Sequence, residues 1–156
     1  MTTPTANTQG SIVCGSARFT LISEQCIRME YAPNYGFVDA PTLFAVNRES
    51  ASVDATVQQR GKSITIKTKR LTVKFRDDGK PFHAGNLKVV YRQGKERVEW
   101  NPGMQDSQNL GGPAATLDNI SEAFDLPDGI LSREGWHLVD DSGNAILKDE
   151  WIRQRP

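Results

Sequence analysis

The sequence has few of the residues that build metal and redox sites. Its 156 residues include only two cysteines, Cys14 and Cys26, and only two histidines. With no third cysteine or nearby histidine, the cysteine pair cannot complete a metal site of the usual ligand spacing. Two reduced thiols are therefore expected in place of a disulfide, and no metal or other cofactor is predicted.

Long hydrophobic runs and a net charge are also missing. No stretch of about 18 apolar residues occurs, so no membrane-spanning helix is predicted. Residues 1–11 lack both the basic start and the apolar stretch of a secretory signal, which predicts a disordered lead-in to a cytoplasmic chain. Lys plus Arg number 19 and Asp plus Glu number 19. Because this balance leaves no global field to attract a polyanion, neither nucleic acid nor membrane is an expected partner.

The motifs of common hydrolases and nucleotide-binding proteins are absent as well. There is no Gly-x-Ser-x-Gly, no Gly-x-x-x-x-Gly-Lys and no pair of histidines at helical spacing. His83 and His137 stand alone in the sequence, so surface or packing roles are favoured over that of a base. A glycosidase needs two carboxylates across a sugar ring, but any two of the many here could be proposed. No residue of this chain is predicted to be catalytic.

Two-residue alternation is the main pattern that is present. Leu71, Val73 and Phe75 alternate with polar residues, as in a strand with one buried face. Similar short stretches predict hairpins over 19–31, 53–68 and 87–100, and a last one pairs Trp136–Val139 with Ala145–Leu147. No dozen residues carry a helical stripe, so the fold class is predicted to be all-β, an antiparallel β-sandwich formed as one domain by residues 12–156.

Two segments have a composition of their own. The basic stretch Lys62–Arg76 interleaves its charges with apolar residues and is interpreted as a solvated strand face. Asn101–Gly129 is rich in Gly, Pro, Asn and Asp and poor in strand formers. It is too long for an ordinary connection, and long ordered loops in compact domains are often functional.

Six short motifs follow one another in the last third of the chain, and together they resemble one family. They are Trp100–Gly103, Asn109–Gly112, Thr116–Asp118, Leu131–Trp136, Val139–Ser142 and Asp149–Trp151. In this order they resemble the amino-terminal domain of glycoside hydrolase family 31, the α-glucosidase family. The resemblance covers nearly the whole chain, weakly as far as Arg92 and well from Glu99 onward.

The resemblance implies a particular kind of sandwich and a particular partner. In the family, a galactose-mutarotase-like (supersandwich) β-sandwich precedes a catalytic (β/α)8 barrel, and one of its loops reaches over the barrel's active-site pocket. No part of this chain matches barrel sequence. The chain is therefore expected to be a fragment, an excised domain or one piece of a split gene, and its sandwich is expected to lack the last strand or strands.

The resemblance also implies candidate substrate contacts. Ser132-Arg133-Glu134-Gly135 matches the family's Ser-Arg-Asp-Gly motif, whose acidic residue approaches sugar hydroxyls. Glu134 is thus the first candidate, and Arg133 is expected to hold the carboxylate or the loop in place. Trp136 could stack on a pyranose, although such a position is more often part of a core.

The chain departs from the family pattern at three positions. Glu134 stands where Asp is usual, Pro113 where Thr is common and Ala115 where Arg is common. The added methylene of Glu134 moves its carboxylate outward by about 1 Å, which matters where hydrogen bonds require about 2.7–3.0 Å. Which α-linked sugar is preferred therefore does not follow from the resemblance.

The expected function is that of a non-catalytic, sugar-binding or sugar-positioning domain of a retaining α-glycosidase acting on α-linked carbohydrate. Its partners would be that carbohydrate and the catalytic barrel, and the chain alone would be inactive. The alternative is a free-standing carbohydrate-binding or interaction module on the same scaffold, because fold does not fix function. An independent mutarotase would need a histidine and a carboxylate facing one sugar, and no motif here supplies them.

Overall fold

The computed structural model describes residues 6–8, 10–46, 52–112, 121, 123, 125–148 and 151–153. It divides into two compact units. We call Met1–Gly103 with Asp141–Pro156 the sandwich unit, and Met104–Asp140 the loop unit. No helix that could cross a membrane occurs among the described residues. The sequence prediction treated 12–156 as one domain, whereas these residues fall into both units.

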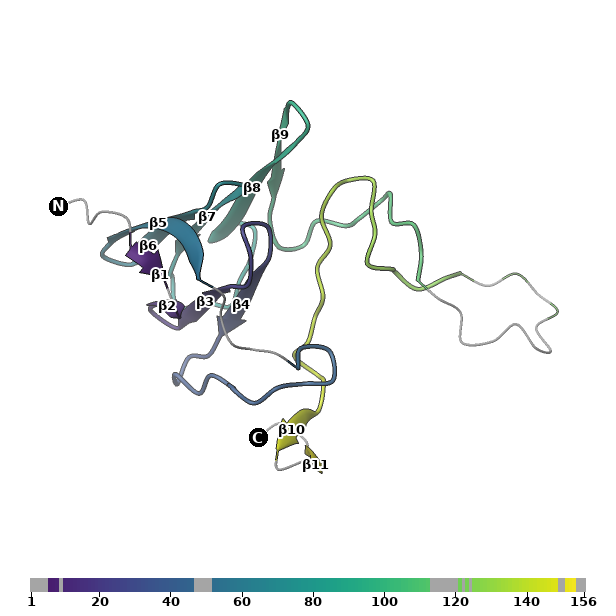
Figure 1. Ribbon diagram of the computed structural model, residues 1–156, viewed down its shortest axis with the longest axis horizontal. Helices are drawn as coiled ribbons and strands as arrows, with labels where there is room; N and C mark the ends of the chain where they lie inside the picture. Colours follow the sequence, from purple (N-terminus) through teal and green to yellow (C-terminus); the bar gives the residue numbers. More distant parts are fainter. Residues whose placement is uncertain are drawn as a thin grey trace. The chain divides into compact units, whose positions relative to one another are not determined.

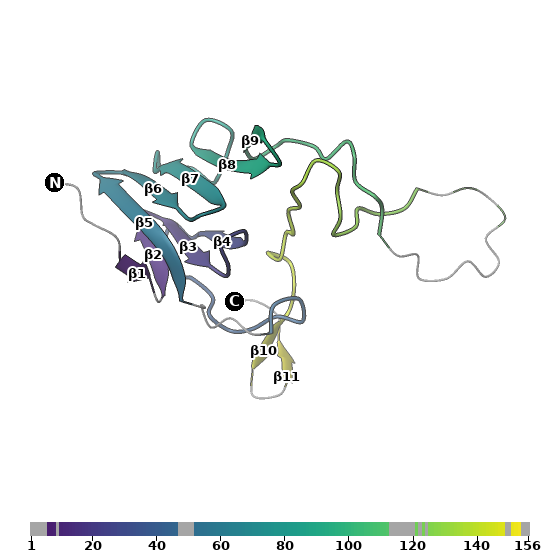
Figure 2. The same ribbon diagram turned by 45° about the horizontal axis from the view of Figure 1, so that its top comes forward.

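In the sandwich unit two antiparallel sheets face one another (Figures 1 and 2), and a third, two-stranded sheet is formed near the carboxyl-terminal end. The first has three strands in the order β2-β3-β4, and the second has six in the order β1-β5-β6-β7-β8-β9. The strands of the first are β2 (Ser11–Cys14), β3 (Ala17–Leu21) and β4 (Ile27–Tyr31). Those of the second are β1 (Ala6–Thr8), β5 (Val53–Arg60), β6 (Ser63–Lys67), β7 (Leu71–Arg76), β8 (Leu87–Gln93) and β9 (Glu96–Trp100).

Aromatic side chains join the two sheets. Phe19 of β3 is fully buried, and its ring centroid lies 5.5 Å from that of Phe75 on β7. Phe82 lies 5.9 Å from Phe19, 5.4 Å from Phe75 and 6.0 Å from Tyr31. Each buried aromatic ring contributes about 1.5–3 kcal/mol. Alternation in β7 buries Leu71 and Val73 with Phe75, which confirms the face predicted from the sequence.

Asn86 arranges the connection between β7 and β8 so that Phe82 reaches this core. Its side-chain amide donates to Asp78 Oδ1 at 3.1 Å and to the Pro81 carbonyl at 3.0 Å. Its Oδ1 accepts the His83 amide at 2.8 Å. One buried side chain thus hydrogen-bonds to Asp78, Pro81 and His83 along the loop. These bonds hold the connection in place without secondary structure.

The three hairpins expected near 19–31, 53–68 and 87–100 are confirmed by the pairs β3–β4, β5–β6 and β8–β9. Gly61 turns the second of these with a φ of 54°, a backbone conformation that favours glycine. Cys14 is buried and Cys26 exposed, and both thiols are free.

The predicted last hairpin is wrong. Trp136–Val139 forms no strand, and β10 (Ile146–Lys148) pairs with β11 (Trp151–Arg153). The reason is tertiary: Ile146 forms a bridge with Thr42, and the Leu147 amide donates to the Pro41 carbonyl at 2.7 Å. A segment about a hundred residues away in the chain therefore takes the hydrogen bonds that the local pattern had assigned to 136–139.

The amino-terminal segment also differs from its prediction as a disordered lead-in. Ala6–Thr8 form β1 along the edge of β5, and Ser11 begins β2. Residues 1–5 lie outside the described part of the chain. β1 is only three residues long, and its formation depends on the open edge of β5.

Candidate functional site

The loop unit is built on two segments that run antiparallel to each other, 106–112 and 127–135. Asn109 and Ser132 form a β-bridge. The Leu110 amide donates to the Leu131 carbonyl at 3.0 Å, and the Arg133 amide donates to the Gln108 carbonyl at 3.1 Å. This short ladder places the motif Leu131–Trp136 beside Asp106–Leu110.

Asn109 holds the two segments together. Its Oδ1 accepts the amides of Gly129 at 2.7 Å and Gly111 at 2.9 Å, and its Nδ2 donates to the Gly129 carbonyl at 3.1 Å. A Cβ on Gly129 would overlap the Gly111 carbonyl, so only glycine permits this close approach. The motif Asn109–Gly112 is thus an architectural element of the loop unit.

Asp106 links Asn109 to the predicted site. Its carboxylate accepts hydrogen bonds from the Ser132 hydroxyl at 2.6 Å, the Gln108 amide at 3.1 Å and the Asn109 amide group at 2.9 Å. Desolvation raises the pKa of Asp106, but these hydrogen bonds and the charge of His137 outweigh it and hold the pKa below its ordinary value. Asp106 is therefore an ionised acceptor that fixes Ser132.

Ser132 in turn fixes Glu134, whose side chain is held by two further residues. The Glu134 amide donates to Ser132 Oγ at 3.0 Å. Glu134 Oε1 accepts the Ser107 hydroxyl at 2.7 Å and the Ser107 amide at 3.2 Å, and Oε2 accepts the Trp136 indole N–H at 3.1 Å. The result is a half-buried carboxylate beside a half-buried aromatic ring, both on one turn.

The structure brings two of the three predicted site residues together. Glu134 and Trp136 are hydrogen-bonded neighbours, whereas Arg133 between them is exposed and anchored through its backbone. Ser107 and Trp136 contact the Glu134 carboxylate, and the expected role of Arg133 in holding that carboxylate or the loop stays a prediction. Parts of the family pattern lie outside the described residues: Pro113, Ala115, Thr116–Asp118, Asp149–Glu150 and the side chain of Trp151.

Sequence reasoning missed the supporting residues Asp106 and Ser107, and it treated Asn109 only as part of a motif. The available signal was local. Asp and Asn side chains readily accept backbone amides two residues further on, and Asp106–Gln108 and Asn109–Gly111 are such pairs. The contacts across to Ser132 and Gly129 could not be seen, because they depend on which segments become neighbours.

Large apolar side chains are exposed on the loop unit. Leu110, Leu126, Ile130, Leu131 and Leu138 are 50–74% exposed. So many exposed large aliphatic residues in one small unit are unusual for a surface that faces only water.

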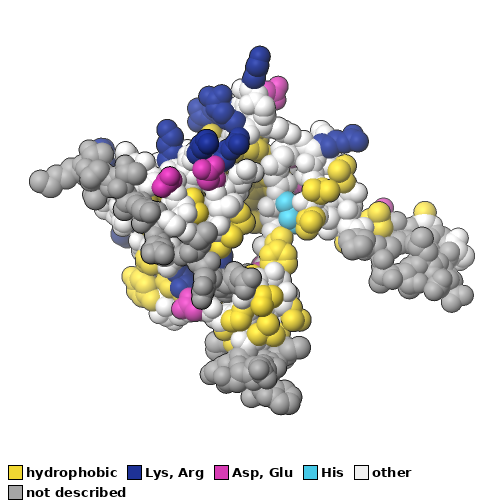
Figure 3. Space-filling view, in the orientation of Figure 1, with side chains coloured by type: hydrophobic (Ala, Val, Ile, Leu, Met, Phe, Trp, Pro, Cys, Tyr) yellow, Lys and Arg dark blue, Asp and Glu magenta, His cyan; other side chains and the backbone are white. Residues whose placement is uncertain are grey.

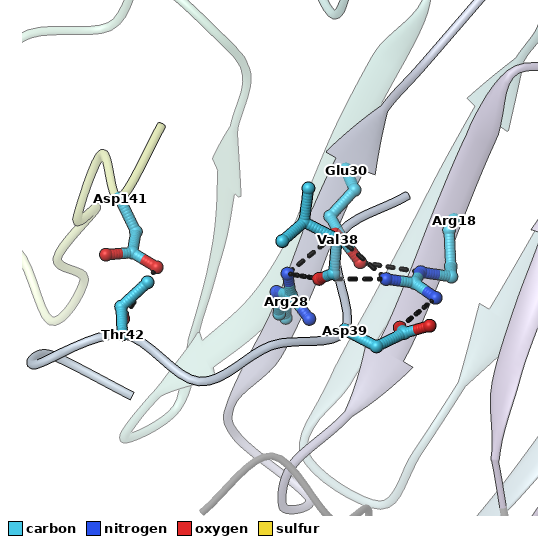
Figure 4. Close-up of polar contacts among 7 residues, drawn as sticks. All are labelled: Arg18, Arg28, Glu30, Val38, Asp39, Thr42 and Asp141. Carbon is cyan, nitrogen blue, oxygen red and sulfur yellow. Dashed lines mark hydrogen bonds and ion pairs between the residues drawn. The ribbon is translucent and has the colours of Figure 1, made fainter. Parts of the chain in front are cut away.

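A second polar cluster, centred on Arg18, is structural (Figure 4). Arg18 is 8% exposed, and its guanidinium pairs with Glu30 at 2.7 and 3.0 Å and with Asp39 at 2.6 Å. Its Cζ lies 4.7 Å from the centre of the Phe37 ring, and Arg28 joins through Glu30 and the Val38 carbonyl. Since Nε, Nη1 and Nη2 all bind groups of the chain, this cluster fastens 37–39 over the three-stranded sheet.

His83, one of the two histidines for which a surface or packing role was predicted, is hydrogen-bonded within its own loop. His83 Nε2 lies 2.9 Å from Asp78 Oδ2, and Nδ1 accepts the Gly85 amide at 3.1 Å. Among the described residues no group of three His, Cys, Asp or Glu is placed to hold a metal ion. The loop around Glu134 is therefore the candidate site.

Comparison with known proteins adds no family assignment: no family model and no curated protein matches the chain.

Proposed function

We propose that this chain is the amino-terminal, galactose-mutarotase-like β-sandwich of a retaining α-glycosidase related to glycoside hydrolase family 31, and that its loop unit positions an α-linked sugar for a catalytic barrel. The observation that carries this proposal is the turn Ser132–Trp136. It presents a carboxylate and an aromatic ring side by side, held by Asp106 and Ser107.

This pair of groups suits a sugar. An ionised carboxylate accepts hydroxyl hydrogen bonds that are shorter and stronger than neutral ones, and an indole ring offers an apolar face to the C–H groups of a pyranose. Because Ser107 and Trp136 already hold Glu134, its geometry is set before a ligand arrives, which lowers the entropic cost of binding. Glu134 and Trp136 would be substrate contacts, and Arg133 would lie at the rim.

The chain would not cleave the sugar itself. Retaining glycosidases use two carboxyl groups about 5–5.5 Å apart across the scissile bond, and in the resembled family both belong to the barrel. The exposed leucines of the loop unit would be covered by that barrel. A cytoplasmic location is also part of the proposal.

The test is a set of variants in the full-length parent enzyme. Glu134→Gln keeps the shape but removes the charge, and the loss of a charged hydrogen bond of about 1.5–3 kcal/mol corresponds to a roughly ten- to hundredfold fall in kcat/KM. Trp136→Phe keeps a ring but removes the N–H that holds Glu134, so a smaller fall is expected. Thermal melting should not change for either variant.

Glu96→Gln is the matched control, because Glu96 is an exposed glutamate at the start of β9. Kinetics equal to wild type for Glu134→Gln would contradict the proposed contact. The alternative, a free-standing carbohydrate-binding or interaction module, has a separate test. A coding sequence that stops after codon 156 would favour it, and an in-frame barrel would favour the enzyme domain.

A further inference from the structure

The outer face of the six-stranded sheet carries mainly positive charge. The alternation that buries Ile64, Ile66 and Val73 turns the intervening residues outward. We call this outer surface the basic face; its charged residues are Arg60, Lys67, Lys74, Arg76, Lys88, Arg92 and Arg97, with only Asp54 and Glu99 of opposite sign. Each of these cations is exposed. Figure 3 shows Lys and Arg side chains gathered over this sheet.

Most of these cations have no carboxylate beside them. Glu99 pairs with Lys88 at 2.8 Å and with Arg97 at 3.1 Å. The ion pairs among the described residues include none of the other cations of this face. Lys74 lies directly opposite Lys88, and like charges opposite one another across two strands destabilise a sheet. The basic face therefore holds positive charge that the described residues do not neutralise.

Glu99 responds to the positive potential of this face. The hydrogen bond from Lys88 at 2.8 Å, with the charges of Lys88, Arg97 and Lys74, lowers the pKa of the Glu99 carboxyl. Lys74 contributes although it lies on β7 and forms no ion pair with Glu99. The positive potential thus extends across β7, β8 and β9.

Hydroxyl side chains alternate with the cations on the two central strands. Ser63 lies opposite Arg76, Thr65 opposite Lys74, and Lys67 opposite Thr72. Each of these cross-strand pairs of β6 and β7 thus places one cation beside one hydroxyl. Neighbouring strands are about 4.8 Å apart, and residues two apart on one strand are separated by about 6.8 Å. The basic face is therefore a closely spaced array of cations and hydroxyl groups.

The same face offers little to a nucleic acid base or to a lipid chain. The aromatic residues of β7 to β9, Phe75, Tyr91 and Trp100, lie at positions of the inner face, and the apolar residue on the outer face, Val90, is half-buried. Single-stranded nucleic acids are held by stacking on aromatic rings, and proteins anchored in a membrane surface bury apolar side chains in it. A polymer that carries both anions and hydroxyl groups would use both kinds of group on this face.

We propose that the basic face binds an acidic polysaccharide, a sugar chain with carboxylate or sulfate groups along its length. The cations bind these anions, and the Ser and Thr hydroxyls hydrogen-bond to the sugar hydroxyls between them. The neutrality of the whole chain does not oppose this contact, because charges act over only about 8 Å at physiological ionic strength. The proposal is independent of the Glu134 site, whose residues belong to the loop unit.

The test is calorimetric titration of the whole chain with heparin, which carries sulfates, and with polygalacturonate, whose anions are all carboxylates. Binding of at least one of them is expected, and the tighter one identifies the preferred anion. The affinity should fall as salt rises from about 0.05 to 0.2 M, because binding releases counterions from the polymer. Dextran, which has hydroxyl groups but no charge, should not bind.

Two pairs of substitutions separate the roles of charge and hydroxyl. Lys74→Gln with Lys88→Gln removes two exposed charges and should raise Kd roughly three- to thirtyfold. Thr65→Val with Thr72→Val keeps every charge and suits a strand, and it should raise Kd roughly two- to tenfold. Circular dichroism of each variant establishes that the sheets are intact.

Arg70→Gln with Lys80→Gln is the matched control, since it removes two exposed cations that lie outside the strands. Its Kd should equal that of wild type. Glu134→Gln should also leave Kd unchanged, so this proposal and the sugar-positioning role of the loop unit succeed or fail separately.

Three results would overturn the proposal. The first is that neither acidic polysaccharide binds at the lower salt concentration. The second is an equal Kd for Lys74→Gln with Lys88→Gln and for the control. The third is tighter binding of single-stranded DNA, or of vesicles that contain phosphatidylserine, which would assign the basic face to a nucleic acid or to a membrane.

Discussion

At the scale of single residues, Asn109 has the largest structural effect in the loop unit. It accepts two glycine amides and donates to Asp106 and to the Gly129 carbonyl, so it joins segments twenty residues apart. Asn109→Ala leaves the amides of Gly111 and Gly129 without this acceptor. At about 0.5–1.5 kcal/mol per hydrogen bond, the local opening free energy should fall by about 1–3 kcal/mol.

Amide hydrogen exchange measures this effect. Exchange should accelerate in 106–112 and 127–135 and stay at the wild-type rate in β5–β9. Asn109→Asp, which keeps an acceptor and loses the donor, should have a smaller effect. Equal protection in wild type and Asn109→Ala would show that the backbone ladder alone holds the loop unit.

The Asp78 carboxyl makes the stability of the sandwich unit depend on pH in the acid range. Hydrogen bonds from His83 and Asn86 lower the pKa of Asp78 from 3.8 to about 2. Because the folded-state pKa is the lower one, the unfolded chain binds more protons between these values. The stabilisation is therefore complete above about pH 4 and is lost as pH falls towards 2.

Melting temperature between pH 2 and 5 tests this expectation. The difference in melting temperature between wild type and Asp78→Asn should become smaller as pH falls from 5 to 2. Asp54→Asn is the control, since Asp54 is an exposed carboxylate on β5 without these contacts. A gap that is constant over the whole range would mean that Asp78 stabilises the fold only through its shape.

At the scale of elements, the cluster centred on Arg18 holds residues 37–39, which belong to no strand, against the three-stranded sheet. Removing one partner of a buried ion pair leaves the other charge uncompensated. Asp39 is exposed and can return to water, but Glu30 is only 15% exposed and would keep only one of its two ion pairs, the one with Arg28 at 2.6 Å. Arg18→Met should therefore lower the free energy of unfolding by about 3 kcal/mol, near the low end for such pairs.

Urea denaturation provides the measurement, and Arg70→Met provides the matched control. The Arg70–Glu24 pair is exposed and its atoms are 4.0 Å apart, so its loss should change stability by less than about 0.5 kcal/mol. Equal effects of the two substitutions would show that the Arg18 cluster is no stronger than a surface pair.

The elements also show where sequence patterns were informative. Alternation and turn glycines locate β5 to β9 closely, because a hairpin is decided by neighbours in the chain. They fail for 136–139, which form no strand, because β10 pairs with β11 and not with this segment. They also missed β2, which is short and lies at a sheet edge.

At the scale of the whole molecule, the two units should differ in local stability. The sandwich unit buries Phe19, Ile66 and Val73 completely, while the loop unit exposes most of its large aliphatic side chains. Regions with little buried apolar surface open at lower free energy. Amide exchange in 104–140 is expected to be faster than in β5–β8, by a factor of about ten for each 1.4 kcal/mol of difference in opening free energy.

Hydrogen exchange on the chain alone, and with the proposed barrel added, would measure both states. Slowing confined to 104–140 on addition of the barrel is expected. Exchange that is equally slow in loop and strands of the chain alone would contradict the need for a covering partner.

The sequence by itself determined the all-β class, the long hairpins, the buried face of β7 and the neutrality of the chain. Each of these depends on composition or on residues that are close in the chain. Only the tertiary structure decided that Ile146 at the start of β10 contacts Thr42, and that Asp106, Ser107 and Asn109 support Glu134. It also placed basic residues of the five strands β5 to β9 on one face of their sheet. The physical reason is that Thr42 and Ile146, like the residues that support Glu134, lie far from their partners in the chain, and no local pattern specifies which distant segments become neighbours.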